Sequence, residues 1–273
     1  MVDQPDGHWA WAAVSALARQ DGTAVALRHT VIACADSLAA AGAGLALARN
    51  GTPREPLLAS NAIAEELEEL QFLLGEGPGM DAAAGRGPVL VADLAGPDAQ
   101  RRWPLFAPAA VDRGIRGMFA FPVATGAALV GVLDAYRQHP GPLGQQQLAD
   151  ALMFADAMLL LAVDSRGGIT TDLSDLLDTP LSARRAHVHQ ATGMVAAQLE
   201  VSVTDALAAL RGYAFTHGRR LGDVAADVVD RRIRLSVNAE NDAAGPSTPE
   251  KPGKDGGNPV NPGWQAEGRQ EEE

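Results

Sequence analysis

The sequence contains a single cysteine, Cys34, and aromatic residues make up only 4% of it. One cysteine excludes an internal disulfide and a zinc site built on cysteine ligands, and we expect Cys34 to be a small buried apolar residue. The first residues, MVDQPDGHWAW, lack the basic start and apolar run of a secretory signal peptide. The most apolar stretch, 151–163, is interrupted by Asp156 and is too short to span a bilayer. These absences predict a cytoplasmic protein without a membrane segment.

The sequence also lacks the motifs of common enzyme classes. It contains neither the G-x-S-x-G of serine hydrolases nor the H-E-x-x-H of zinc proteases. The stretch GEGPG (75–79) has no following Lys and Ser/Thr, so we expect a plain loop there rather than a phosphate cradle. His187 and His189 are two positions apart on a predicted helix, so they cannot share a metal ion. The sequence therefore predicts neither catalysis nor a metal site.

Lysine is scarce, with two residues against 20 arginines, and acidic residues exceed basic ones by 12. The charge is unevenly distributed. Residues 1–179 hold 11 Arg against 21 acids, residues 180–237 hold 8 Arg against 5 acids, and residues 238–273 hold 3 basic against 8 acidic residues. The net charges are thus −10, +3 and −5. A short basic segment inside an acidic chain is where we expect a polyanionic partner to bind.

Composition also divides the chain into parts. The last 36 residues contain five Pro and six Gly with almost no apolar residues, so residues 237–273 are predicted to be a disordered acidic tail. Gly167 and Gly168 follow a long apolar helix and mark a second break. We therefore predict a first domain at 8–166, a linker at 167–179 and a second domain at 180–236.

The first domain is expected to alternate between helices and strands. Its hairpins are predicted around NGTPR and around Gly126-Ala127, because each turn lies between two apolar runs. The predicted helices cover 24–41, 63–74, about 105–113 and 143–165, and the predicted strands cover 44–50, 55–61, 88–94, 118–125 and 128–137.

Two stretches of this domain carry a family resemblance. GEGPGMDAAAGRGPVLVADL, followed by RGIRGMFAFPVATGAALVGVLDAYR, resembles the GAF family of small-molecule sensor domains over roughly residues 24–165. The resemblance implies an antiparallel sheet with flanking helices and a small-molecule ligand between the sheet and the connecting helices. It leaves the ligand or cofactor unknown. Trp103 and Phe106 could line such a pocket, but we expect them to be core residues.

The basic segment has the pattern of a small three-helix bundle. A helix over 181–199 places Val188, Ala191, Val195 and Leu199 on one stripe. Ser202 and Asp205 form a capping box that starts a second helix, for which Gly218 is a stop signal. A third helix is expected in LGDVAADVVDRRIRL. The fold class predicted for the whole chain is α+β.

The order HQATGMV, SVTDALAALRGYA and RLGDVAADVV resembles the ANTAR domain over about 181–235. ANTAR domains are RNA-binding antitermination modules, so the resemblance implies a regulator that binds paired stem-loops in nascent RNA and keeps a terminator from forming. Two loops on one transcript suit a homodimer, with the helix 143–165 as a coupling or dimer element. No catalysis is implied.

A set of polar and basic residues in this segment is expected to contact the RNA. Gly193, with Ala196 and Ala197, forms a stripe of small residues that fits either helix packing or the approach of an RNA backbone. Thr192 stands where the family commonly has Lys, which leaves at most a hydroxyl for a phosphate. Tyr213, Phe215 and His217 are candidates for base stacking. The predicted RNA-binding residues are Gln190, Thr192, Gly193, Arg211, Arg219, Arg220, Arg231 and Arg232, with Arg234 as a further candidate.

Two other functions remain open from the sequence. A DNA-binding regulator would place the third helix in a major groove, although the acidic face of that helix is unfavourable for phosphate contacts. A protein–protein module without a nucleic-acid partner would be consistent with the modest charge of +3.

Overall fold

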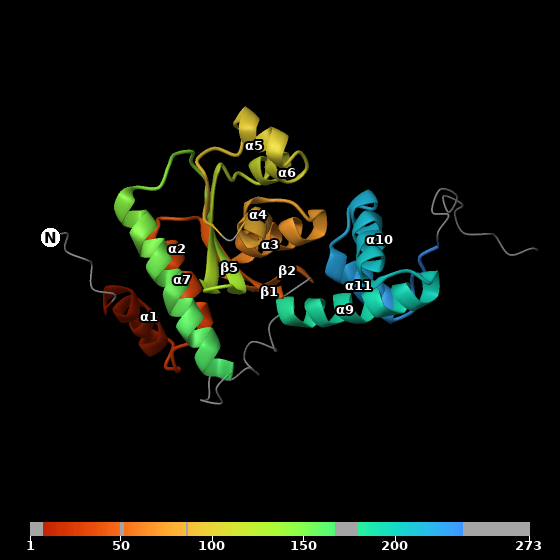
Figure 1. The fold of residues 1–273 in the computed structure, drawn as a ribbon, viewed down its shortest axis with the longest axis horizontal. Coiled ribbons are helices and arrows are strands. Elements are labelled where there is room, and N and C mark those ends of the chain that lie inside the picture. The colour runs from red at the N-terminus through yellow and green to blue at the C-terminus, as the bar shows by residue number, and fades with distance from the viewer. Residues whose placement is uncertain (1–7, 50–51, 86, 167–179, 237–273) are drawn as a thin grey trace, which may run out of the picture. The chain divides into compact units, whose positions relative to one another are not determined.

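The computed structural model describes residues 8–49, 52–85, 87–166 and 180–236 (Figure 1). Its five strands form one antiparallel sheet in the order β2-β1-β5-β4-β3. The strands are β1 (Gly42–Arg49), β2 (Thr52–Ala59), β3 (Val89–Val91), β4 (Gly117–Thr125) and β5 (Ala128–Arg137). Both predicted hairpins are present, with Arg49 opposite Thr52 and Thr125 opposite Ala128. Gly126 supplies the positive φ, 54°, that the second turn requires.

Alternation along the central strands distributes side chains to two apolar layers. Phe119 and Phe121 of β4 belong to the same buried cluster as Leu133 of β5, whereas Met118 and Tyr136 belong to another. Successive residues of a strand point to opposite faces, so one strand can serve both layers. Because both layers are covered, β4 and β5 read as nearly continuous apolar runs rather than as half-polar strands.

Helices cover each face of the sheet (Figure 1). The first layer contains α1 (His8–Gln20), α2 (Leu27–Ser37) and α7 (Gln145–Arg166), and its cluster includes the fully buried Cys34. The second layer contains α3 (Ala62–Leu74), α4 (Pro78–Gly85), α5 (Pro97–Arg102) and α6 (Phe106–Asp112). Trp103 and Phe106 are buried in that layer, which confirms their assignment to the core.

Three helices follow the gap in the described residues at 167–179. They are α9 (Pro180–Leu199), α10 (Val203–Thr216) and α11 (Leu221–Val229). They share one apolar cluster, in which Val188, Ala191 and Val195 lie as the predicted stripe requires. Ser202 caps α10 by accepting a hydrogen bond from the Asp205 backbone N–H at 3.1 Å. Gly218 has a φ of 60° just beyond α10, as a helix stop signal should. The predicted α+β fold, a sheet with flanking helices followed by a helical bundle, is confirmed.

The third helix is shorter than predicted, because it ends at Val229 and RRIRL lies outside it. The backbone N–H of Arg232 donates to the Asp227 carbonyl, and that of Arg231 donates to the Val228 carbonyl. This is the Schellman pattern of a helix end, which places Arg231 in the left-handed region with φ 60°. Glycine favours that conformation, and because Arg stands at this position no local pattern marks the end of the helix.

Three further elements were not predicted: α1, α4 and α5. The stretch GEGPG proves to be a loop only as far as Gly77, because α4 begins at Pro78. The predicted linker 167–179 and tail 237–273 lie outside the described residues. Among the described residues no single helix is long and apolar enough to cross a membrane; Ala186–Leu199 and Val203–Thr216, bent by 107°, pass such a test only as a pair. Contacts join the described residues up to Ser236 in one compact unit.

Candidate nucleic-acid interface

Two of the predicted RNA-binding arginines are paired within the bundle itself. Arg219 and Arg232 each reach the Asp227 carboxylate at 2.6 Å, and Arg232 also reaches Asp230 at 2.8 Å. The hydrogen bonds from Arg219 and Arg232 hold the pKa of Asp227 below its usual range. The acidic residues of α11 thus already balance much of the charge of these two side chains.

Arg211 of α10 points toward the sensor-like domain rather than toward solvent. Its guanidinium lies 4.8 Å from the centre of the Phe72 ring of α3. Burial lowers the pKa of Arg211, and its Nε and Nη2 atoms have no hydrogen-bond partner among the described residues. Because these two nitrogens are buried, Arg211 cannot contact a phosphate in this arrangement.

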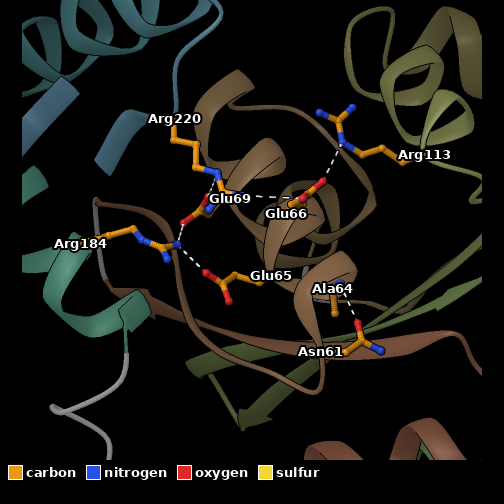
Figure 2. A network of polar contacts seen from close by, with 8 residues as sticks. All are labelled: Asn61, Ala64, Glu65, Glu66, Glu69, Arg113, Arg184 and Arg220. Atoms are coloured by element: carbon orange, nitrogen blue, oxygen red, sulfur yellow. Dashed lines mark hydrogen bonds and ion pairs between the residues drawn. The ribbon is translucent and has the colours of Figure 1, made fainter. Parts of the chain in front are cut away.

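Arg220 takes part in a polar network between α3 and the bundle (Figure 2). Its guanidinium lies 3.6 Å from Glu66 and 3.9 Å from Glu69. Arg113, the C-cap residue of α6, reaches the other oxygen of Glu66 at 3.4 Å. Because Arg220 is the N-cap residue of α11, its backbone position is fixed by the start of that helix. It therefore presents its charge to α3.

Arg184 of α9 is the centre of the same network, and the sequence analysis did not single it out. Its guanidinium bridges Glu65 and Glu69 on successive turns of α3 (Figure 2). Burial raises the pKa of Glu69, although the bond from Arg184 opposes that effect. The side chain of Arg184 crosses the start of α11 at Gly222, where an added Cβ would approach it to 2.9 Å. The close approach explains a glycine at that position.

A hydrogen bond joins α9 to the sheet. The His189 Nε2 atom lies 3.0 Å from a carboxylate oxygen of Glu55 in β2, which is largely buried. A groove of about 480 Å³ between α3 and the bundle is lined by Glu66, Arg219 and Arg220 among others, so the network is reachable from solvent.

The remaining predicted residues lie on α9 and in the segment that follows α11 in the sequence. Gln190 and Gly193 are exposed, and a Cβ on Gly193 would meet no atom within 4 Å. Packing within the described chain therefore does not require glycine at 193. Thr192 is buried, and its hydroxyl donates to the Val188 carbonyl at 2.6 Å instead of facing solvent.

Arg231 and Arg234 are the predicted cations that stay available. Both are exposed, and neither forms an ion pair within the described part of the chain. They line a groove of about 640 Å³ together with Met194 and Ala197 of α9, one helical turn from Gly193. This groove combines free positive charge with a surface of small residues.

The aromatic candidates differ from one another in accessibility. Phe215 is 52% exposed. Tyr213 is half-buried and stacks on His217 with ring centres 3.9 Å apart. Phe215 and His217 are both exposed, whereas Tyr213 is partly covered.

The sheet face beneath α3 carries a buried polar group of four side chains. Tyr136 donates to the Glu68 carboxylate at 2.7 Å, and the amide of Gln71 donates to Asp134 at 2.9 Å. These residues lie between the sheet and a connecting helix, where the resemblance to sensor domains implies a ligand. Among the described residues no group of three His, Cys, Asp or Glu side chains is arranged to hold a metal ion.

The comparisons agree with the resemblance found in the bundle. Residues 182–229 match the model of the ANTAR domain family, which confirms that resemblance for 48 of the 273 residues. No curated protein matches the chain.

Several solved structures are similar to the larger part of the chain. The GAF domain of a phosphoenolpyruvate-protein phosphotransferase from Coxiella burnetii is 14% identical, covers 59% of this chain and 97% of its own, and has a TM-score of 0.44. The GAF-B domain of DevS from Mycobacterium smegmatis is 20% identical, with 52% and 95% covered and a TM-score of 0.38. Free methionine-R-sulfoxide reductase from Neisseria meningitidis is 18% identical, with 60% and 93% covered and a TM-score of 0.40.

Proposed function

We propose that this chain is a cytoplasmic antitermination regulator in which a GAF-type sensor domain (8–166) controls an RNA-binding ANTAR domain (180–236). The ANTAR match at 182–229 is the observation that carries the proposal. The protein would bind two stem-loops of a nascent transcript and thereby prevent a terminator from forming. No covalent step is involved, so the residues need only bind and position RNA.

The available cationic surface supports this function. Arg231 and Arg234 are free to contact phosphates, and the neighbouring Gly193 and Ala197 let an RNA backbone approach α9 closely. Gln190 is exposed on the same helix and can hydrogen-bond to a base or a sugar. Phe215 supplies an exposed ring on which a base can stack.

A homodimer would present two such surfaces to the two loops. Leu152 and Leu160 on α7 are 42% and 57% exposed, and their spacing of eight places them on one face of the helix. Exposed leucines on a surface helix, here with Asp156 between them, suit a helix–helix contact between two copies. The proposed signal for the first domain is a small molecule bound between α3 and the sheet.

The test is binding of the full-length protein to an RNA with two short hairpins, beside a single hairpin and duplex DNA, over a range of salt. We expect a preference for the double hairpin and an affinity that falls as salt rises, since phosphate contacts release counterions. The variant Arg231→Gln/Arg234→Gln should bind roughly tenfold more weakly and lose about one unit of salt slope per phosphate contact.

The matched control is Arg19→Gln/Arg101→Gln, which removes the same charge from exposed positions on α1 and α5. It should bind RNA like the wild type. Equal affinity for all three nucleic acids, or affinity for none of them, would contradict the proposed function. A salt-independent complex with another protein would instead indicate an interaction module.

A further inference from the structure

Two faces of α3 make contacts, one with the sheet and one with the helical bundle. Glu68 and Gln71 point to the sheet and are fully buried, whereas Glu65, Glu69 and Phe72 contact the helical bundle. Residues three, four and seven apart share one face of a helix, so the three contact residues form a single stripe. The same helix thus links the buried polar group of the sensor-like domain to the ANTAR domain.

The stripe meets the bundle with carboxylates and one aromatic ring. Glu65 and Glu69 bind Arg184, and Glu66 and Glu69 lie beside Arg220 (Figure 2). Phe72 enters the apolar cluster of the bundle beneath Arg211. Carboxylates and phosphates offer guanidinium groups the same charge and the same pairs of acceptor oxygens. The carboxylates of α3 therefore occupy Arg184 and Arg220 as an RNA backbone would, and Phe72 covers Arg211.

We propose that the bundle face formed by Arg184, Arg211 and Arg220 is a second RNA-backbone surface, and that α3 and RNA compete for it. The inference rests on the proposed function. In the closed arrangement α3 covers most of Arg184 and Arg211, whereas Arg220 is exposed at the edge of this surface. The groove at Arg231 and Arg234 is open to RNA. Displacement of α3 opens the second surface, so the RNA affinity of the full chain depends on how firmly α3 is held.

Three observations favour competition over a permanent interface. Among the bundle arginines whose side chains the structure describes, those not paired with Asp227 divide between the open groove and the face under α3. Arg211 leaves two guanidinium nitrogens without a hydrogen-bond partner among the described residues, and a phosphate would satisfy them. Burial raises the pKa of Glu69, which means that its charge is not fully compensated in the closed arrangement.

The experiment compares RNA affinities of full-length variants by fluorescence anisotropy with the double-hairpin RNA over a range of salt. Glu65→Gln/Glu69→Gln removes the competing charges and keeps the shape of the side chains. The control Asp36→Asn/Asp98→Asn makes the same change of two charges at exposed positions on α2 and α5, away from the bundle and from α7.

We expect Glu65→Gln/Glu69→Gln to bind RNA at least about fivefold more tightly than the control, with a steeper salt dependence because more phosphates are contacted. Adding Arg184→Gln to that variant should abolish the gain. In the wild type, hydrogen exchange of the α3 amides should become faster when RNA is added. This last measurement needs no variant to fold.

Affinity and salt slope equal to those of the control, together with unchanged exchange in α3, would overturn competition while leaving RNA binding intact. Failure of the wild type and of every variant to bind any RNA would overturn the proposed function as well. RNA binding by Glu65→Gln/Glu69→Gln alone would support both.

Discussion

Phe72 is the residue whose replacement tests most directly how α3 is joined to the helical bundle of α9, α10 and α11. It belongs to α3 in sequence, yet its side chain is 7% exposed and lies in the apolar cluster of α9, α10 and α11. The Arg211 guanidinium covers its ring at 4.8 Å. Phe72→Ala removes both the ring that fills this cluster and the surface on which Arg211 rests.

The expected loss follows from these two contacts. Replacing a buried Phe by Ala costs about 3–5 kcal/mol, with the lower end where the surroundings can close around the gap. The cation–π contact of a partly desolvated Arg contributes about 1 kcal/mol of that loss. Because Phe72 lies between α3 and the bundle, which can move together to close the gap, we expect the free energy of unfolding to fall by about 3 kcal/mol.

The assay is hydrogen exchange by mass spectrometry, combined with urea denaturation followed by far-UV circular dichroism. Phe72→Ala should lower the free energy of unfolding and speed exchange in α9, α10 and α11. The control, Phe121→Ala, removes the same side chain from a cluster that contains no bundle residue. It should destabilise the sheet and leave exchange in the bundle unchanged.

Two outcomes would refute the reasoning. A loss below about 1 kcal/mol would mean that the ring is not buried against the bundle in solution. Faster exchange in the bundle for Phe121→Ala as much as for Phe72→Ala would mean that the contact is not specific to Phe72.

Two further predictions concern acid stability and assembly. Hydrogen bonds from Arg219 and Arg232 lower the pKa of Asp227 in the folded protein. Their stabilisation of the bundle is therefore fully present above the ordinary Asp pKa of about 4, and it is lost as the pH falls through the lower pKa of the folded state. Asp227→Asn should therefore flatten the dependence of bundle exchange on pH in that range; an unchanged profile would assign the dependence to other carboxylates. Leu152→Glu/Leu160→Glu should convert the proposed dimer to a monomer by light scattering, whereas a wild-type mass for this variant would exclude α7 from the dimer contact.

The sequence by itself determined the main elements and the class of the second domain. Apolar periodicity predicted both hairpins, α3, α7 and the three helices of the bundle. Apolar residues that alternate share one face only in a strand, and those that recur every third or fourth residue share one face only in a helix. The Ser202 cap and the Gly218 stop are local signals that depend on neighbours only a few residues away. The ANTAR pattern was readable for the same reason, since its residues lie on one short segment.

Elements with weak local signals were missed. α4 and α5 have eight and six residues, too few for a periodic pattern, and α11 ends at an Arg in the left-handed region where a Gly would have been recognised. In each case the contacts of the folded chain, rather than a local preference, decide where the helix begins or ends.

Only the tertiary structure decided what the arginines do. The sequence predicts one set of RNA-binding arginines, but in the folded chain they contact α3, Asp227 or solvent. The set comprises Arg211, Arg219, Arg220, Arg231 and Arg232. Arg184 binds carboxylates at least 115 positions away in the chain, so no local pattern could have identified its partners. Charge is a property of the residue, whereas its availability to a partner depends on which opposite charges the folded chain places beside it.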